Sequence, residues 1–430
     1  MAWERICKLE DCLDALIDYR GKTPRKTDFG IPLITAKVVK SGHIGKLDEF
    51  IPEEDYETWM KRGYPEIGDV VLTTEAPLGE VAQIKFLPVA LAQRIVTLRG
   101  KQGVLDSGYL LYLMQSQEMQ EKLLSRSSGT TVIGIKQREL RKIEVALPSV
   151  SEQRAIAHIL GTLDDKIELN RRQSETLQEM ARALFKAWFV DFEPVRAKMS
   201  GRWQRGQTLP GLPAHLWDLF PDRLVETEHG EVPQGWEVAM LKDEFDVTMG
   251  QSPPGSTYNE AGEGLPFYQG RADFSFRFPK KRVYCTAPTR LAKAGDTLVS
   301  VRAPVGDINM AAEDCAIGRG VAAVRHKTGN LSYTYHFMNA IADKLSQYNA
   351  EGTVFGSINK KDFGAITHVK PSPEAIAEYG KLAGVWDSQI EICQLESHTL
   401  TALRDTLLPQ LLSGALRVPD VEHILEEVPL

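Results

Sequence analysis

The sequence lacks any run of about 18 uninterrupted apolar residues, and its N-terminus carries no charged-then-apolar leader. We therefore expect a protein that neither spans a membrane nor is exported, and that stays in the cytoplasm. Its five cysteines are scattered, without the close paired spacing of zinc or redox sites. We interpret them as reduced and mostly buried. No metal site and no directly bound cofactor are predicted.

Motifs for catalysis are missing as well. There is no GxxxxGK[ST] loop to cradle a phosphate and no glycine-rich dinucleotide fingerprint. There is also no Asn-Pro-Pro-aromatic stretch of the kind that adenine methyltransferases use, since Ser252-Pro253-Pro254 lacks both the amide and the aromatic ring. These absences favour a protein without enzymatic activity of its own. A stand-alone nuclease or methyltransferase with unfamiliar motifs stays open as an alternative.

The formal net charge of −7 argues against indiscriminate coating of nucleic acid, but it leaves room for one basic face. Two local basic clusters fit such a face, and a solvated surface is the alternative interpretation of each. The clusters are Lys136, Arg138, Arg141 and Lys142, and Arg277, Lys280, Lys281 and Arg282.

The 430-residue chain is long enough for two or three domains, and its two halves repeat one another. Short β-branched runs at 69–74, 92–99, 296–302 and 320–326 predict that each half is a strand-rich domain followed by a long helix. The matching positions are Gly68 and Gly295, Asp69 and Asp296, Ala76 and Ala303, Pro77 and Pro304, Ile135 and Ile358, and Pro148 and Pro371.

Each predicted helix has the seam of a coiled coil, with apolar residues at alternating steps of four and three. Asn170 and Ser174 make the first seam polar in its middle, and we interpret them as a register device, with a water-facing gap as the alternative. Pro194 signals the end of the first helix. The apolar seam positions are Ile156, Leu160, Leu163, Ile167, Leu177, Leu184, Trp386, Ile390, Leu400 and Leu407.

The first helix also contains a nuclease-like fragment, Asp164-Asp165-Lys166. Its counterpart in the second half, Asp387-Ser388-Gln389, has no lysine, which makes a catalytic site improbable. Two diverged domains joined by helices of fixed length instead suit the reading of two different DNA half-sites, roughly one to two turns of DNA apart at about 34 Å per turn. A coiled-coil scaffold that joins partners without reading DNA is the other alternative.

Residues 147–199 and 209–238 resemble the central region and the second-domain entry of specificity subunits of Type I restriction-modification systems. With the repeat, this resemblance covers essentially the whole chain. It implies an α+β fold with an internal pseudo-two-fold duplication, in which two strand-rich target recognition domains are separated by two long antiparallel coiled-coil helices. The implied boundaries are 1–148 for the first recognition domain, 149–194 for the central helix, 195–232 for a linker, 233–371 for the second recognition domain, and 372–430 for the distal helix and tail.

The resemblance also implies the partners. A specificity subunit of this family is non-catalytic and binds double-stranded DNA at a bipartite, asymmetric site. It docks two methyltransferase subunits and two restriction subunits, which act as translocase and endonuclease. S-adenosylmethionine, ATP and magnesium are then expected on those partner subunits and not on this chain.

Base readout needs side chains that present two hydrogen-bonding atoms, so Arg, Lys, Gln and Asn on loops are the candidates. A surface residue, or a phosphate contact that carries no sequence information, is the alternative for each. Glu75 stands where the second copy has Arg302, and the family commonly has Arg at this position. If Arg302 contacts DNA, the first domain must do so differently. The DNA-binding candidates are Lys22, Lys136, Gln137, Arg138, Gln269, Arg271, Arg302 and Lys360.

Overall fold

The computed structural model describes residues 3, 5–129, 131–228, 230–349 and 356–421. Residues 1–2, 4 and 422–430, at the ends of the first and last predicted domains, lie outside this description. The chain divides into two units, one comprising Met1–Asn170 with Leu395–Leu430 and the other comprising Arg171–Gln394. Over the described ranges, no helix combines the length and apolar character needed to cross a membrane.

Two long helices, α6 (Val150–Phe189) and α12 (Pro373–Ser413), each contribute one half to each unit. The other elements of the first unit are β1 (Arg5–Lys8), α1 (Leu9–Cys12), β2 (Leu13–Asp18), β3 (Ile31–Ile34), β4 (Val39–Lys40), β5 (His43–Ile44), β6 (Phe50–Ile51), α2 (Tyr56–Trp59), β7 (Val70–Thr74), β8 (Leu78–Gln83), β9 (Ala90–Leu91), β10 (Ile95–Gly100), α3 (Ser107–Gln115), α4 (Gln117–Ser125), α5 (Gln137–Arg141) and β11 (Glu144–Leu147).

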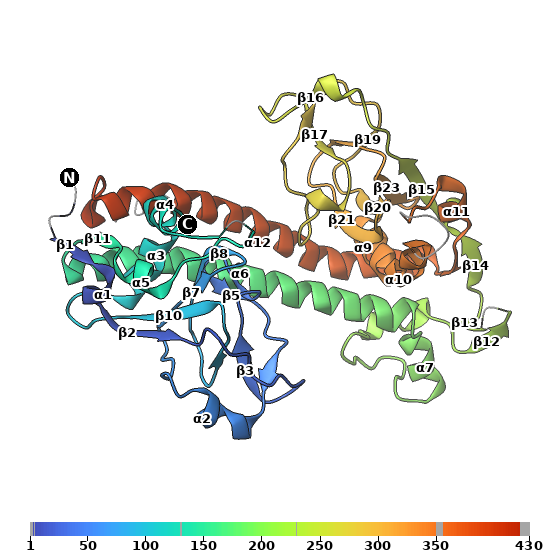
Figure 1. Ribbon diagram of the computed structural model, residues 1–430. Helices are drawn as coiled ribbons and strands as arrows, with labels where there is room; N and C mark the ends of the chain where they lie inside the picture. The colour runs from blue at the N-terminus through green and yellow to red at the C-terminus, as the bar shows by residue number, and fades with distance from the viewer. Residues whose placement is uncertain (1–2, 4, 130, 229, 350–355, 422–430) are drawn as a thin grey trace. The chain divides into compact units, whose positions relative to one another are not determined.

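The first unit is built around a four-stranded antiparallel sheet in the order β2-β10-β7-β8 (Figure 1). Its strand β7 is buried at every position, because each of its two faces packs on a different apolar core. Val70 and Leu72 join the core that contains Tyr109 of α3, whereas Val71 joins the core of the three-stranded sheet β6-β3-β9. A strand covered on both faces reads as a continuous apolar run, as this one does.

The second unit repeats this plan. Its elements are α7 (Glu193–Met199), β12 (Leu224–Thr227), β13 (Gly230–Pro233), β14 (Glu237–Met240), α8 (Leu241–Glu244), β15 (Phe245–Met249), β16 (Tyr258–Asn259), β17 (Leu265–Tyr268), β18 (Tyr284–Cys285), β19 (Leu291–Ala292), β20 (Thr297–Val301), β21 (Val305–Met310), β22 (Cys315–Ile317), β23 (Val321–His326), α9 (Leu331–Ala340), α10 (Ala342–Ser346), α11 (Lys360–Ala365) and β24 (Thr367–Lys370).

The four-stranded sheet of the second unit has the order β15-β23-β20-β21, which matches strand for strand the sheet of the first unit. Val299 and Val301 of β20 pack in the core that contains Tyr379 of α12, whereas Leu298 packs in a smaller core with Tyr268. Next to it lies a distal five-stranded sheet, β16-β18-β17-β22-β19 (Figure 1). The predicted α+β fold with two strand-rich regions and two long helices is thus confirmed.

The predicted seam faces the protein interior along both helices. Ile167, Leu177 and Trp386 are half-buried, and the other seam residues are buried. The helix α6 ends at Phe189, before the Pro194 that we read as its stop signal. The chain turns there because Phe192 adopts a left-handed conformation, with φ of 54°, and α7 then places Pro194 in its first turn.

Within the first unit, α6 and α12 run antiparallel and are joined by polar contacts across the seam. The amide Nδ2 of Asn170 donates a hydrogen bond to Glu396 Oε2 at 2.7 Å, and Lys166 Nζ lies 3.1 Å from Glu396 Oε1. Arg404, which is polar in an apolar seam, lies 2.7 Å from Asp164. These contacts support the register role of Asn170, which stays a prediction.

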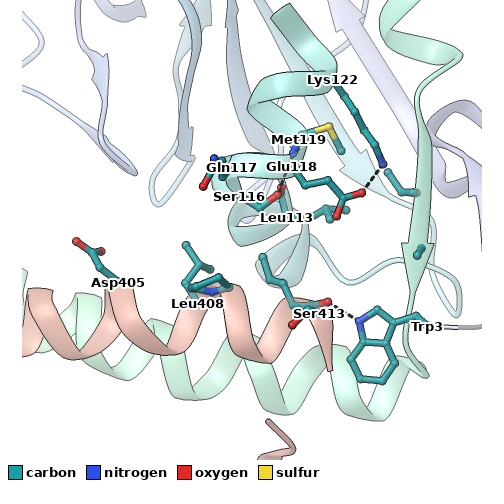
Figure 2. Close-up of a pocket in the computed structure, with 14 residues that line it drawn as sticks. Trp3, Leu113, Ser116, Gln117, Glu118, Met119, Lys122, Asp405, Leu408 and Ser413 are labelled. Carbon is teal, nitrogen blue, oxygen red and sulfur yellow. Dashed lines mark hydrogen bonds and ion pairs between the residues drawn. The ribbon is translucent and has the colours of Figure 1, made fainter. Parts of the chain in front are cut away.

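The first and last described segments of the chain meet at the end of this helix pair. The indole nitrogen of Trp3 donates a hydrogen bond to the carbonyl oxygen of Leu412. A largely apolar pocket of about 610 Å³ opens beside it, between α4, β11 and α12 (Figure 2). On its rim Lys122 Nζ lies 2.6 Å from Glu118 Oε1.

Candidate nucleic-acid interface

The strand-rich regions of the two units carry the same backbone turn after β7 and after β20. These two regions are called the recognition regions from here on, after their predicted role. In each copy an alanine with positive φ, 49° at Ala76 and 39° at Ala303, precedes a proline through a cis peptide bond. A later segment crosses the turn and leads directly into a short helix, α5 or α11. The matching contacts are Ile135 N to Thr74 O at 3.0 Å, Ile358 N to Val301 O at 3.1 Å, a β-bridge of Glu75 with Gly134, and a β-bridge of Arg302 with Ser357.

In the second unit this geometry brings several of the predicted residues to one end of the sheet. Lys360 begins α11 soon after the bridge made by Arg302. Gly320 lies so close to the Gln269 carbonyl oxygen that an added Cβ would be 2.3 Å away from it. Because Val301 N donates to Gly320 O at 2.8 Å, Gln269, Arg302 and Lys360 belong to one neighbourhood.

The predicted residues of the first unit also gather at the corresponding end. Lys136 caps α5 and is followed by Gln137 and Arg138 in its first turn. Arg20, which sequence reasoning missed, donates from Nη1 to the carbonyl oxygen of Ile135 at 2.9 Å. Since Lys22 follows Arg20 by two residues, this bond ties the segment of Lys22 to the start of α5.

Some of the positively charged candidate residues already pair with a carboxylate, and others are free to contact DNA. Arg271 Nε lies 3.1 Å from Asp307 Oδ2, and Arg138 Nε lies 3.1 Å from Glu139 Oε1, so both cations are already paired. Among the candidate residues, four exposed cations have no side-chain partner within the described part of the chain and remain available to phosphate or base atoms. These are Lys22, Lys136, Arg302 and Lys360.

In the first unit Glu75 stands where the second unit has Arg302, and a nearby arginine, Arg94, takes over that place. Glu75 pairs with Arg94, with 3.3 Å between Oε1 and Nε. Arg94 occupies the position of Gly320, because Arg94 O accepts from Thr74 N just as Gly320 O accepts from Val301 N. The first unit therefore also presents a guanidinium at this turn, although it comes from the turn that precedes β10.

The Asp164-Asp165-Lys166 fragment is not a catalytic cluster. Asp164 is buried and accepts hydrogen bonds from Tyr112 at 2.8 Å and from Arg404 at 2.7 Å. Burial, together with the adjacent Asp164 carboxylate, raises the pKa of Tyr112. Asp165 and Lys166 instead pair with other residues of the first unit, and no group of acidic, histidine or cysteine side chains in the described ranges could hold a metal ion.

Asp387 occupies the same repeat position in the second unit and has corresponding partners. Arg277 Nη2 donates to Asp387 Oδ1 at 2.6 Å, and His336 Nε2 lies 3.6 Å from the same oxygen. The guanidinium also lies 3.9 Å from the centre of the Tyr335 ring. Arg277 is 1% exposed, so its interpretation as part of a basic surface cluster is wrong. Its burial depends on α12, which is distant in sequence.

Comparison with known proteins identifies the family. The profile of the Type I restriction modification DNA specificity domain matches residues 4–179. The putative type I restriction enzyme MjaX specificity subunit of Methanocaldococcus jannaschii is 30% identical, over 97% of this chain and 94% of the relative. The chain belongs to the specificity subunits of Type I restriction enzymes. As a member of this family it is a non-catalytic, DNA-binding subunit, so the enzymatic alternative falls away.

Further relatives agree with this assignment. The MjaIX specificity subunit of the same organism is 27% identical over 97% of this specificity subunit and 94% of the relative. The HindI specificity subunit of Haemophilus influenzae is 27% identical over 72% of this chain and 77% of the relative. The crystal structure of a Type-I restriction-modification system S subunit from M. genitalium shares the fold, with a TM-score of 0.58 at 17% identity and 95% coverage of both chains.

Proposed function

We propose that this specificity subunit reads a bipartite, asymmetric DNA site, one half with each recognition region. The observation that carries the proposal is the repeated turn with different side chains on it. The backbone is the same at Glu75 and Arg302, while the side chains at this position and at Arg94 and Gly320 differ. Two regions with the same backbone at this turn but different polar side chains on it would dock on DNA in the same way and recognise different bases.

The unpaired cations supply the remainder of the interface in this proposal. Lys22 and Lys136 at one turn, and Arg302 and Lys360 at the other, would neutralise phosphates or reach base edges. Gln137 and Gln269 are amides of the kind that pair with two atoms of adenine. The overall charge of −7 argues against indiscriminate binding of DNA over the whole surface and so favours binding at local basic sites such as these.

The long helices would dock the partner subunits. Both carry large apolar side chains that stay exposed on the side away from the seam, such as Leu169 (57% exposed) and Val385 (68% exposed). Helices that pair through one face and expose apolar residues on another are typical of protein–protein contact sites. The other exposed apolar residues of these helices are Met180, Ile392 and Leu395.

By this proposal two methyltransferase subunits and two restriction subunits assemble with the chain. S-adenosylmethionine would be bound by the methyltransferase subunits, and ATP and magnesium by the restriction subunits. The chain itself would position these enzymes on the DNA through its recognition regions.

Mapping methylated adenines across the genome, in cells with this gene and in cells without it, tests the proposal. A two-part motif with a fixed gap that is methylated only in the presence of the gene is the expected result. A change at a single uninterrupted motif would overturn two-part reading. Identical maps, obtained while the chain co-purifies with methyltransferase subunits, would instead favour a scaffold that does not read DNA.

A further inference from the structure

The buried apolar residues of the distal five-stranded sheet pack on the four-stranded sheet and, among the described residues, not on α12. They include Tyr268, Ala292 and Phe267, and the two small clusters that contain them include no residue of α12. The four-stranded sheet, by contrast, shares one core with Tyr379 and Ala383 of that helix. Any direct link between the distal sheet and α12 is therefore made by other contacts.

Arg277 provides such a contact. It lies on the loop between β17 and β18 of the distal sheet, and its guanidinium reaches Asp387 on α12 at 2.6 Å. The backbone of the same loop is fixed to β21, since Met310 N donates to Arg277 O at 2.9 Å and Asn309 Nδ2 donates to Ser275 O at 2.7 Å. The loop is thus fixed both to the four-stranded sheet and to the helix.

This arrangement is costly for stability. Arg277 is 1% exposed, and its Nε and Nη1 atoms have no hydrogen-bond partner in the described part of the chain. A buried ion pair of this kind seldom stabilises a fold more than apolar residues of equal size would, and its best attested use is to select one arrangement. The ring of Tyr335 and the nearby His336 complete the surroundings of the pair.

The loop and the sheet that Arg277 holds carry candidate DNA-reading groups. Gln269 and Arg271 directly follow β17, and the exposed Lys280 follows Arg277 by three residues. The first unit is tied differently, because the arginine that pairs with the buried Asp164 comes from α12 itself, and the loop cation Lys85 pairs instead with the exposed Asp165 of α6 at 2.8 Å. The pair of the second unit differs from that exposed pair in being buried, with Arg277 1% exposed.

Given the proposed two-part reading of DNA, on which this inference rests, we infer that Arg277 is a positioning residue for gap length. By clamping the distal sheet to Asp387 of α12, it fixes where the second recognition region meets its half-site. One base pair more or less in the gap moves that half-site by about 3.4 Å and turns it by about 35°. If the second recognition region is held rigidly, it cannot bind a half-site that is shifted in this way. If it is held loosely, it can move to follow the shift.

The test uses the complete methyltransferase complex and a DNA library in which the two half-sites are separated by the natural gap or by one base pair more or less. The variant Arg277→Met should lower the preference for the natural gap by roughly tenfold, about 1.4 kcal/mol. The double variant Arg277→Met with Asp387→Leu, which leaves no unpaired buried charge, should do the same, so that the effect is not caused by a stranded carboxylate. The bases preferred within each half-site should stay the same. Arg277→Lys, which keeps a positive charge beside Asp387, should restore most of the preference.

The matched control is Arg325→Met, which breaks an arginine–carboxylate pair with Asp296 in the same unit that does not involve α12. It should lower stability and leave the gap preference intact. The inference is overturned if the gap preference of the assembled Arg277 variants is unchanged, if only their base preference changes, or if Arg325→Met relaxes the gap equally. If the wild-type complex methylates no two-part site, the proposed function itself fails.

Discussion

Glu75 and Arg94 form an ion pair at the end of the first four-stranded sheet, with Oε1 and Nε 3.3 Å apart. In the second unit the corresponding positions hold Arg302 and Gly320, so a guanidinium is present at both turns but at different positions of the repeat. The pair leaves Arg94 53% exposed, which keeps part of its guanidinium accessible to DNA. Each turn can therefore be tested on its own by substituting Arg94 or Arg302.

Replacing Arg302 by Ala should affect the second half-site alone. A bidentate contact from arginine to a base contributes about 1–3 kcal/mol of discrimination, so methylation at the wrong base should rise by a corresponding factor. The measurement is the methylation rate on DNA with single changes in either half-site. Lys293→Ala, which removes a cation already paired with Asp314, is the control. Equal loss at both half-sites would show that Arg302 acts structurally.

Replacing Arg94 by Ala should weaken or relax reading of the first half-site alone, again by about 1–3 kcal/mol. The same set of DNA substrates measures the effect. Lys122→Ala, which breaks a pair with Glu118 on α4, is the control in this unit. If Arg94→Ala leaves both half-sites unchanged, then the first region reads its bases without a guanidinium at the turn.

Replacing Tyr112 by Phe should lower the free energy of unfolding by about 1–2 kcal/mol, since it removes one hydrogen bond to a buried carboxylate. The lost bond is that from Tyr112 Oη to Asp164 Oδ2 at 2.8 Å, while Arg404 still pairs with the carboxylate. Denaturant unfolding of the full chain measures the change. Tyr64→Phe, at a half-exposed tyrosine, should change little, and an equal loss there would contradict the explanation.

Acid should destabilise the second unit through its buried histidines. Burial lowers the pKa of His368 from 6.5 to about 4, against the opposing effect of Glu244. Above pH 6.5 the imidazole is neutral in both states and has no effect on stability. As the pH falls from 6.5 toward 4, His368 is protonated in the unfolded chain but stays neutral in the folded chain. The free energy of unfolding therefore falls by up to about 3 kcal/mol.

Burial also lowers the pKa values of His326 and His336, so their effects add in the same direction. Thermal unfolding midpoints recorded between pH 7.5 and pH 4.5 measure this dependence. His368→Phe, placed between the rings of Phe245 and Phe337, should make the midpoint fall less steeply with acid. A dependence as steep as that of the wild type would contradict the role of His368.

Replacing Gly320 by Ala should disturb the second recognition turn for steric reasons. The added Cβ would lie 2.3 Å from the Gln269 carbonyl oxygen, so backbone must move, at a cost of about 1–3 kcal/mol. Gly270→Ala, next to Gln269, is the control, because no atom lies within 4 Å of its added Cβ. Unfolding midpoints that fall equally for both variants would refute the steric argument.

The sequence predicted those features that depend on local spacing. The seam positions of α6 and α12 recur at steps of three and four, which is a local property of a helix, and the structure places them at buried or half-buried positions. The duplicated turn could be found because its alanine, proline and glycine repeat in order. The sequence nevertheless predicts the end of α6 at Pro194, whereas the helix ends at Phe189, because the turn depends on the left-handed backbone of Phe192 and not on Pro194 alone.

Features that depend on contacts between distant segments were not predictable. Arg277 looked like part of a surface cluster, because nothing near it in sequence shows that Asp387 covers it. Arg94 was not singled out, because its neighbour Glu75 is provided by another strand. The partners of Asp164 likewise come from α3 and from α12. Which candidates contact bases remains a prediction.

The apolar core of the first unit has consequences for the order in which the chain can fold. It contains Leu9 and Leu72 from the beginning of the chain together with Leu400, Leu411 and Val421 from its end. A ribosome would therefore release the first recognition region long before the helix that completes its core has been made. Until then part of this apolar core stays exposed, whereas the second unit, whose residues are contiguous, can complete its own core as soon as it emerges.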